Sequence, residues 1–484
     1  MPKKLLTGLF WILLANLIVK PLWLLGIEVG VQNAVGNSMY GLYSAVFNLA
    51  YILNILLDLG LTNFNTRNIA RHPHLIGKHM GGILGIKLCL LALYVVAAFT
   101  IGALLGYGSD EFSLLAWLCL AQFLNSLILY LRSNFEALLL FRWDSLFSIL
   151  DRLLMIAICG MLLRGPYADR FTILWFAKAQ VAAYAITAVS ALVVIGRRVH
   201  LRKLRWNRVF FIAILRKSAP YALLVLLMAS YNRLDPILLR LISGSDEAGI
   251  YAGAFRLLDA LTMVTYLVSV PLLPIFSRQT ACADHEGLVQ SVRLVFAPTM
   301  AFAIGASITL SAMASPLMEA MYNTSSERYA AVFRLLVFGI IPIGVTYIFG
   351  TLLTAGGRLR ELNIFAASSL LLNAALNLAL IPRLGATGSA WASLSAQGMM
   401  AAAQAWLAMR VYALPTASLR LWRLALFTLL MLAVNTAAAR LALAWQLWMA
   451  AAVFIALVSV PLLRLADPRE VAKMLRQSAG TLAQ

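Results

Sequence analysis

The chain has 484 residues, of which 62% are hydrophobic and only 12% are charged, and its formal net charge at pH 7 is +20. Soluble globular proteins average about 45–50% apolar and about 25% charged residues, so this composition excludes a soluble protein. Runs of mainly apolar residues recur from end to end, and each can cross a hydrocarbon core of about 30 Å. The sequence predicts an all-α polytopic membrane protein.

Fourteen apolar runs are predicted to span the membrane. The first begins after two lysines, but no small-residue cleavage site follows it, so we interpret it as an uncleaved span rather than a signal peptide. The runs lie near residues 5–27, 40–62, 80–104, 112–131, 145–163, 171–195, 219–242, 250–275, 289–313, 331–355, 362–381, 387–409, 424–440 and 445–463.

The basic residues between these runs predict the orientation, because Lys and Arg concentrate in cytoplasmic loops. With the N-terminus inside, most of the 39 Lys and Arg residues fall on the inside. The predicted outside loops instead carry Asp110-Glu111 and Asp246-Glu247. We therefore expect both termini to be cytoplasmic, and the excess positive charge reflects topology, so nucleic acid is not an expected partner.

A dense basic segment divides the chain near its middle and is expected to lie along the anionic inner leaflet. It separates a predicted N-terminal lobe, residues 1–196 with helices 1–6, from a C-terminal lobe, residues 219–411 with helices 7–12. The segment itself is a predicted cytoplasmic linker, residues 197–218. Residues 412–484 form a final helix pair and a cytoplasmic tail. The lobes are predicted to be pseudo-symmetric.

Internal similarity supports this division. Gly41-Leu42-Tyr43 matches Gly249-Ile250-Tyr251, and Phe47 matches Phe255. Six predicted spans separate the two copies, so they point the same way across the membrane. Parallel repeats of this kind occur in transporters that rock two bundles around a midplane site. Chance similarity between apolar spans is the alternative.

A longer stretch carries a family likeness. NLIVKPLWLLGIEVGVQNAVGNSMYGLYSAVFNLAYILNILLDLGLTNFNTRNIARH resembles the N-terminal signature of Wzx-type oligosaccharide flippases, which act on O-antigen and capsular polysaccharide units. NRLDPILL and AGIYAGAFRLLD follow in the second half. NAALNLALIPRLGATGSAWAS is similar to a further pattern of that family and of the multidrug/oligosaccharidyl-lipid/polysaccharide exporter superfamily, through Asn373, Asn377, Pro382, Gly385 and Gly388.

This resemblance implies two six-helix lobes and a final helix pair around a cavity that opens alternately to each side. The implied substrate is an oligosaccharide on polyprenyl pyrophosphate, moved across the bacterial inner membrane. The implied activity is transport rather than catalysis, with no cofactor or metal and with coupling to an ion or to the membrane potential. A polysaccharide polymerase and a chain-length regulator are implied partners. No GxxxxGK[ST] phosphate loop is present.

Charged residues inside the spans are the candidate site, because a charge at mid-bilayer costs about 2.5–3.5 kcal/mol even on a lenient scale. One interpretation is a cationic cavity that binds the pyrophosphate, for which Arg is suited by its bidentate geometry. The other is that long side chains near helix ends extend to the headgroups. Arg233 is the deepest, about 14 Å from the outer end of its span. The candidates are Arg233, Lys20, Arg256, Lys178 and Lys87.

Two acids have separate interpretations. Asp259 is three residues from Arg256 and shares its helix face, so the two are candidates for mutual neutralisation. Asp235 projects nearly opposite to Arg233, and it therefore requires a partner from another helix, such as Lys20, or a coupling cation. Both acids are kept as coupling or charge-pair candidates.

Two prolines and two further acids complete the set of intramembrane features. Pro21 and Pro236 each follow a charged residue and predict a helix bend, because proline removes one backbone donor. Asp58 is predicted to anchor the loop carrying Arg67 and Arg71. Asp151 is predicted to pair with its neighbour, Arg152.

Three other functions stay open. A lipid II flippase fits the same fold and a cationic cavity. A multidrug cation antiporter of the superfamily fits the fold but favours an acidic cavity. A membrane-bound sugar polymerase or ligase needs large outer loops with reactive groups, and the predicted outer loops are short.

Overall fold

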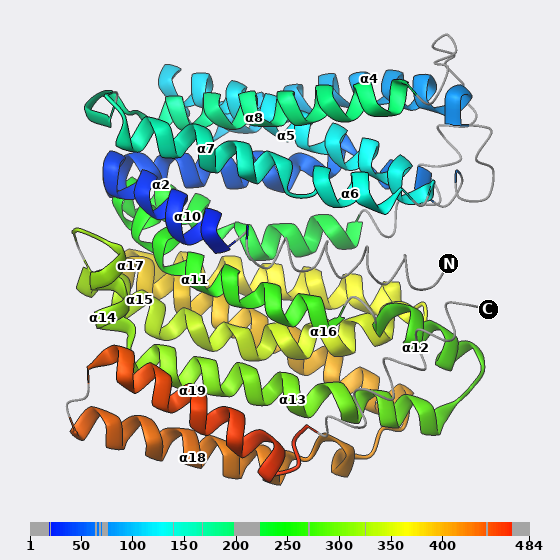
Figure 1. Cartoon of the computed structure of the whole chain (residues 1–484), viewed down its shortest axis with the longest axis vertical. Coiled ribbons are helices and arrows are strands. Elements are labelled where there is room, and N and C mark those ends of the chain that lie inside the picture. The colour runs from blue at the N-terminus through cyan, green and yellow to red at the C-terminus, as the bar shows by residue number, and fades with distance from the viewer. Residues whose placement is uncertain are drawn as a thin grey trace. The chain divides into compact units, whose positions relative to one another are not determined.

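The computed structural model is all-helical over the residues that it describes (Figure 1). These are residues 19, 21–62, 65–66, 69, 76–138, 140–166, 168–197, 223–269, 272–324, 326–441 and 444–466. Within them, 11 helical segments are long and apolar enough to cross a membrane. The predicted class, an all-α polytopic membrane protein, is confirmed.

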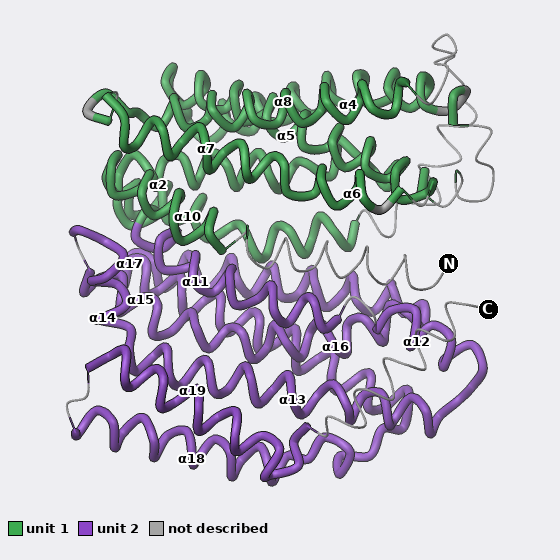
Figure 2. The backbone as a smooth tube through the Cα atoms, viewed as in Figure 1, with its two compact units in different colours: residues 1, 3–249 green, residues 2, 250–484 purple. Residues whose placement is uncertain are grey.

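Chain contacts divide the protein into two compact units, residues 3–249 and residues 250–484 (Figure 2). The helices at residues 223–233 and at Asp235–Ser243 belong to the first unit by this criterion. The lobes proposed from the repeat divide the chain earlier, and that division stays a prediction. Of the predicted linker, only Arg197 falls within the described residues.

Unit 1 is built from helices that are apolar over most of their length. They are η1 (Leu22–Glu28), α2 (Val29–Leu53), η2 (Asn54–Leu57), α4 (Ile76–Leu104), α5 (Ser109–Ala137), α6 (Phe141–Phe147), α7 (Leu150–Arg164), η4 (Ala168–Arg170), α8 (Ile173–Gly196), a helix at residues 223–233, α10 (Asp235–Ser243) and the first turn of α11 (Ser245–Ser269). Helix α5 packs against α8, α2 and α4, and α10 packs against α2. Helix α5 is thus central to the core of this unit.

Unit 2 contains the remainder of α11 and the helices that follow it. They are α12 (Leu272–Ala281), α13 (His285–Ala312), α14 (Ala314–Met321), α15 (Ser326–Leu336), η5 (Val337–Gly339), α16 (Ile340–Ala355), α17 (Leu359–Val411), η6 (Thr416–Leu419), α18 (Leu421–Arg440) and α19 (Trp445–Leu462). Helix α16 packs against α17, α12 and α13, and α13 also contacts α18.

Fourteen spans were predicted and the described residues contain 11 candidate spans, and a kink accounts for part of this difference. The 53 residues of α17 contain a non-helical residue at Gly385 (φ 55°, ψ −132°), so two helices meet there, as two adjacent predicted spans require. Gly36 (φ 79°, ψ 167°) likewise interrupts α2. Glycine adopts these angles at no steric cost. Most of the first predicted span lies outside the described residues.

A polar cluster joins the final helix pair, α18 and α19, to α13 within unit 2. The Asn435 side chain in α18 donates to Thr309 Oγ1 in α13 at 3.2 Å, and it accepts a bond from Trp448 Nε1 in α19 at 2.8 Å. Because Asn435 is buried, these bonds satisfy an amide that apolar surroundings would otherwise penalise.

Within unit 1, α2 and the first turn of α11 cross at two glycines. A Cβ atom added at Gly41 would lie 1.8 Å from the carbonyl oxygen of Ser245, and one added at Gly249 would lie 2.1 Å from that of Asn37. The Gln32 amide also donates to the Gly249 carbonyl at 2.9 Å. These are the two glycines that the sequence repeat aligns, so equivalent positions of the two copies form one backbone contact.

Gly41→Ala is expected to destabilise the protein, because its methyl group must displace backbone rather than a flexible side chain. Overpacking of this kind costs about 3 kcal/mol. Gly160→Ala is the control, since a Cβ there meets nothing within 4 Å. The melting temperature of the detergent-solubilised protein should fall for Gly41→Ala only. Equal melting of both variants would contradict the proposed close contact.

Candidate functional site

Arg233 lies at the end of the helix at residues 223–233, next to an aromatic ring of α2. Its guanidinium carbon is 5.3 Å from the centroid of the Tyr51 ring. This distance is within the range for attraction between a cation and the ring face. Arg233 is half-buried, and Tyr51 is 38% exposed. The deepest cation predicted from the sequence is therefore adjacent to an accessible aromatic face.

Tyr51 is the last member of a row of aromatic side chains along α2, which we call the aromatic row: Tyr40, Tyr43, Phe47 and Tyr51. Their spacing of three or four residues puts them on one side of the helix. Successive ring centroids are 5.6, 5.7 and 6.1 Å apart. Tyr40 and Tyr43 are each 5% exposed, whereas Phe47 is half-buried. The row thus passes from the core of unit 1 to an accessible end.

The buried end of the row is held by neighbouring helices. Tyr43 meets the edge of Phe176 in α8 at 5.1 Å, and Phe176 stacks on Trp23 of η1 at 5.9 Å. The Tyr43 hydroxyl donates to Gln180 Oε1 at 3.4 Å, and the Gln180 amide donates to the Tyr184 hydroxyl at 3.2 Å. The first half of the row is therefore a packed core.

Arg152 of α7 contacts the same core. Its guanidinium carbon lies 5.6 Å from the Trp23 ring and 5.9 Å from the Tyr184 ring. Its Nε is 3.6 Å from Asp151 Oδ2, so the predicted pair of adjacent residues is present. Aromatic faces and a neighbouring carboxylate together stabilise this cation within a span.

Glu28 is an acid of this core that the sequence did not single out. It accepts bonds from Trp23 Nε1 at 3.0 Å and from the Tyr40 hydroxyl at 3.4 Å. Glu28 lies at the end of η1, one residue beyond the predicted end of the first span, so it was not considered as an intramembrane charge. The aromatic row was also missed as a unit, although its three- to four-residue spacing in the sequence is a usable signal.

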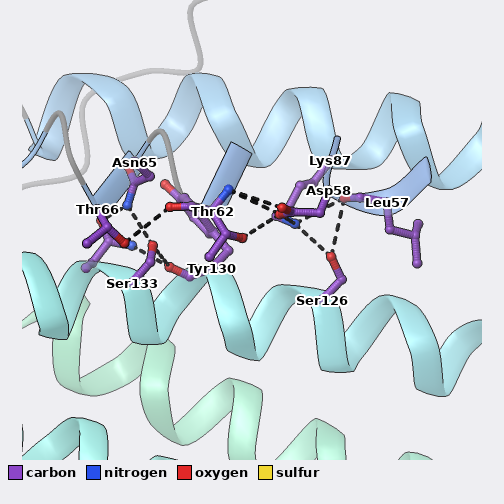
Figure 3. Close-up of polar contacts among 10 residues, drawn as sticks. Leu57, Asp58, Thr62, Asn65, Thr66, Lys87, Ser126, Tyr130 and Ser133 are labelled. Carbon is purple, nitrogen blue, oxygen red and sulfur yellow. Dashed lines mark hydrogen bonds and ion pairs between the residues drawn. The ribbon is translucent and has the colours of Figure 1, made fainter. Parts of the chain in front are cut away.

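Lys87 lies in a different part of unit 1 and is fully engaged there (Figure 3). Its side chain is 1% exposed, and Nζ donates to the Leu57 carbonyl at 3.1 Å, to Asp58 Oδ1 at 3.3 Å and to Ser126 Oγ at 2.8 Å. An ammonium group has three protons, and these bonds use all of them. Lys87 therefore anchors the end of η2 against α4 and α5.

The segment that follows η2 extends this polar network (Figure 3). Asp58 accepts a bond from the backbone N–H of Thr62 at 3.2 Å. The Asn65 amide then donates to Ser133 Oγ and to Asn134 Oδ1 of α5, both at 2.9 Å. Asp58 thus holds the start of this segment, whereas its predicted role in anchoring the loop that carries Arg67 and Arg71 stays a prediction. Its expected neighbours Arg67 and Arg71 lie outside the described residues.

Two further candidate cations have neighbours of their own within their units. Lys178 in α8 is exposed, with Nζ 5.5 Å from the Trp117 ring of α5. Arg256, in unit 2, is 3% exposed and donates from Nη1 to the Tyr322 hydroxyl at 3.0 Å. Asp259, one helical turn from Arg256, is half-buried. Among the predicted cations that the structure describes in unit 1, only Arg233 contacts the row.

The predicted bends coincide with changes in helix geometry. Pro21 immediately precedes the π-helical segment η1. Leu234 separates two helices, and Pro236 lies in the first turn of α10, where its missing N–H is tolerated. Asp235 begins α10 and is 0% exposed. Lys20 lies outside the described residues, so its predicted partnership with Asp235 stays a prediction.

Comparison with known families shows the family to which the chain belongs. Residues 5–280 match the family model described as polysaccharide biosynthesis protein, and this range exceeds half of the sequence. The chain belongs to this family. No curated protein matches the sequence.

Solved structures of transporters share the fold of this family member. The structure of lipid II flippase MurJ in an inward closed conformation has a TM-score of 0.71 and 11% identity, covering 95% of this chain and 98% of that one. An inward-facing multidrug resistance MATE transporter of the MOP superfamily has a TM-score of 0.63 and 14% identity, covering 83% and 98%. A MOP superfamily transporter from Pyrococcus furiosus has a TM-score of 0.60 and 15% identity, covering 85% and 96%.

The Lys87 network predicts unequal effects when its two charges are removed. Asp58→Ala leaves a buried lysine without its carboxylate, which costs about 3 kcal/mol. Lys87→Met should cost less, because the Asp58 side chain is 27% exposed and keeps its bond from Thr62. Thermal unfolding of the purified variants measures both effects.

The control for this comparison is Glu361→Ala. Glu361 pairs with Arg358 at 3.1 Å, but these side chains are 31% and 46% exposed, so the pair should contribute about 0–1 kcal/mol. Losses of stability for Lys87→Met and Asp58→Ala no larger than that for Glu361→Ala would contradict the anchoring role.

Proposed function

We propose that this family member is a flippase for oligosaccharides linked to polyprenyl pyrophosphate. It moves them from the inner to the outer leaflet of the bacterial inner membrane, by alternating access, for O-antigen, capsule or exopolysaccharide synthesis. The observation that carries the proposal is membership of a polysaccharide biosynthesis family by a chain with a transporter fold. A substrate assembled at one leaflet and polymerised beyond the other requires such a step.

Arg233 supports an anionic substrate. A cation within a span is stable where it faces the bundle interior or water, and such a position suits a phosphate ligand. Its guanidinium lies over the Tyr51 ring, and arginine is a side chain suited to bidentate phosphate binding. We retain Arg233, Lys20, Lys178 and Arg256 as proposed substrate-binding cations. Lys87 is assigned to anchoring instead, because its three protons are used within unit 1.

The remaining parts of the proposal follow from the sequence. The loop charges favour cytoplasmic termini. Asp235 and Asp259 are proposed to couple transport to an ion or to pair with cations. A polysaccharide polymerase and a chain-length regulator are the proposed partners at the outer face.

Lipid II transport is the second candidate, because the MurJ structure has a TM-score of 0.71 against this chain. At 11% identity this likeness concerns the fold, whereas the family match concerns polysaccharide synthesis. In the Pyrococcus furiosus transporter, a binding pocket of reverse polarity suggests a different function. Charge in the cavity is therefore a reasonable criterion for separating anionic from cationic substrates in this fold.

Deleting the gene should remove surface polysaccharide and cause its lipid-linked repeat unit to accumulate inside the cell. The physical reason is that the polar glycan and its charged pyrophosphate cannot cross the bilayer unaided. Extraction of lipid-linked oligosaccharides and staining of the surface polymer measure the two effects. Accumulation of lipid II would instead support the second candidate. A normal surface polymer with altered drug tolerance would contradict both.

Arg233→Ala should fail to complement this deletion, although the protein reaches the membrane. Losing a bidentate phosphate contact should lower transport about tenfold or more. Arg440→Ala is the control, because Arg440 is an exposed arginine at the end of α18. Complementation by Arg233→Ala equal to that of Arg440→Ala would reject the phosphate-binding role.

A further inference from the structure

We propose that the accessible end of the aromatic row, Phe47 and Tyr51, binds a sugar ring of the substrate directly beside the pyrophosphate held by Arg233. This inference rests on the proposed function and deepens it, because it separates the group that recognises the glycan from the group that recognises the carrier. Nothing in the family match assigns a glycan-contacting residue.

The exposure of the row distinguishes its two ends. Tyr40 and Tyr43 are 5% exposed and contact other side chains, whereas Tyr51 is 38% exposed and Phe47 is half-buried. The rings of Phe47 and Tyr51 are nearly parallel, with an interplanar angle of 28° and a centroid distance of 6.1 Å. An apolar core does not require an accessible tyrosine at this position, so the exposed end has surface left for a ligand.

The surroundings of Tyr51 indicate that this face meets a polar space rather than lipid. Arg233 lies over the Tyr51 ring at 5.3 Å, and a cation at this depth faces the bundle interior or water. Three residues further along the chain, at the start of η2, the Asn54 amide donates to Gln122 Oε1 at 2.8 Å. A charged group and an amide pair flank Tyr51, whereas a lipid-facing surface would be apolar throughout.

The chemistry of a saccharide matches these groups. One face of a pyranose ring carries C–H bonds, whose partial positive charge is attracted to the negative face of an aromatic ring. The Tyr51 hydroxyl and the half-buried Asn54 amide can exchange hydrogen bonds with sugar hydroxyls, whereas Gln122 is buried and holds Asn54 in place. The sugar that follows the pyrophosphate must lie close to the phosphate-binding cation. The contact between Arg233 and Tyr51 meets that requirement within unit 1.

Binding measurements on the full chain in nanodiscs test this division of roles. The two probes are undecaprenyl pyrophosphate and the lipid-linked oligosaccharide purified from the deletion strain. Tyr51→Ala should weaken binding of the oligosaccharide-bearing probe about tenfold and leave undecaprenyl pyrophosphate within about twofold. Arg233→Ala should weaken both probes. Tyr51→Phe, which keeps the ring, should bind both probes nearly as the unaltered chain does.

Two controls keep the result interpretable. Tyr51→Leu fills a similar volume without an aromatic face, so it replaces Tyr51→Ala if that variant does not fold. Tyr266→Ala removes a 52% exposed tyrosine of α11 and should change neither affinity. The glycan contact would be overturned if Tyr51→Ala or Tyr51→Leu weakened the binding of both probes equally, or if it weakened the binding of neither. Failure of the unaltered chain to bind either probe would instead overturn the proposed function.

Discussion

The cost of placing charge inside a bilayer is the constraint on which this structure depends. A charged side chain within a span must pair, contact an aromatic face or reach water. Unit 1 shows the first two solutions. Lys87 gives its protons to Leu57, Asp58 and Ser126, and it thereby joins three helical elements. Arg152 lies between aromatic faces and the carboxylate of Asp151.

Arg233 differs from these two cations in its surroundings. It lies over the one tyrosine of the aromatic row that is exposed, whereas Arg152 contacts the buried part of the same core. The buried core around the row thus contains the structural cation Arg152, and the accessible end of the row contacts Arg233, which we propose to be functional. Aromatic packing positions α2, and we propose that the accessible end of the row and the adjacent Arg233 face the substrate.

The sequence predicts the spans well because each is encoded locally, by a run of apolar residues of sufficient length. The pairing of Asp151 with Arg152 was also predictable, since the residues are adjacent. By contrast, Lys87 and Asp58 are 29 positions apart, and only the packing of η2 against α4 brings them together. The contact between Arg233 and Tyr51 has the same origin. The depth of a residue within its predicted span could not separate the anchoring Lys87 from Arg233, which we propose to bind substrate, because both lie within apolar spans.

Reconstitution in proteoliposomes tests the central claim most directly. The lipid-linked oligosaccharide from the deletion strain is incorporated with the purified chain, and its exposure at the outer leaflet is followed with a membrane-impermeant glycan-modifying enzyme. The account predicts that the unaltered chain makes the full pool of oligosaccharide accessible, whereas Arg233→Ala leaves only the fraction initially outside. An accessible fraction that is the same with and without the unaltered chain would contradict it.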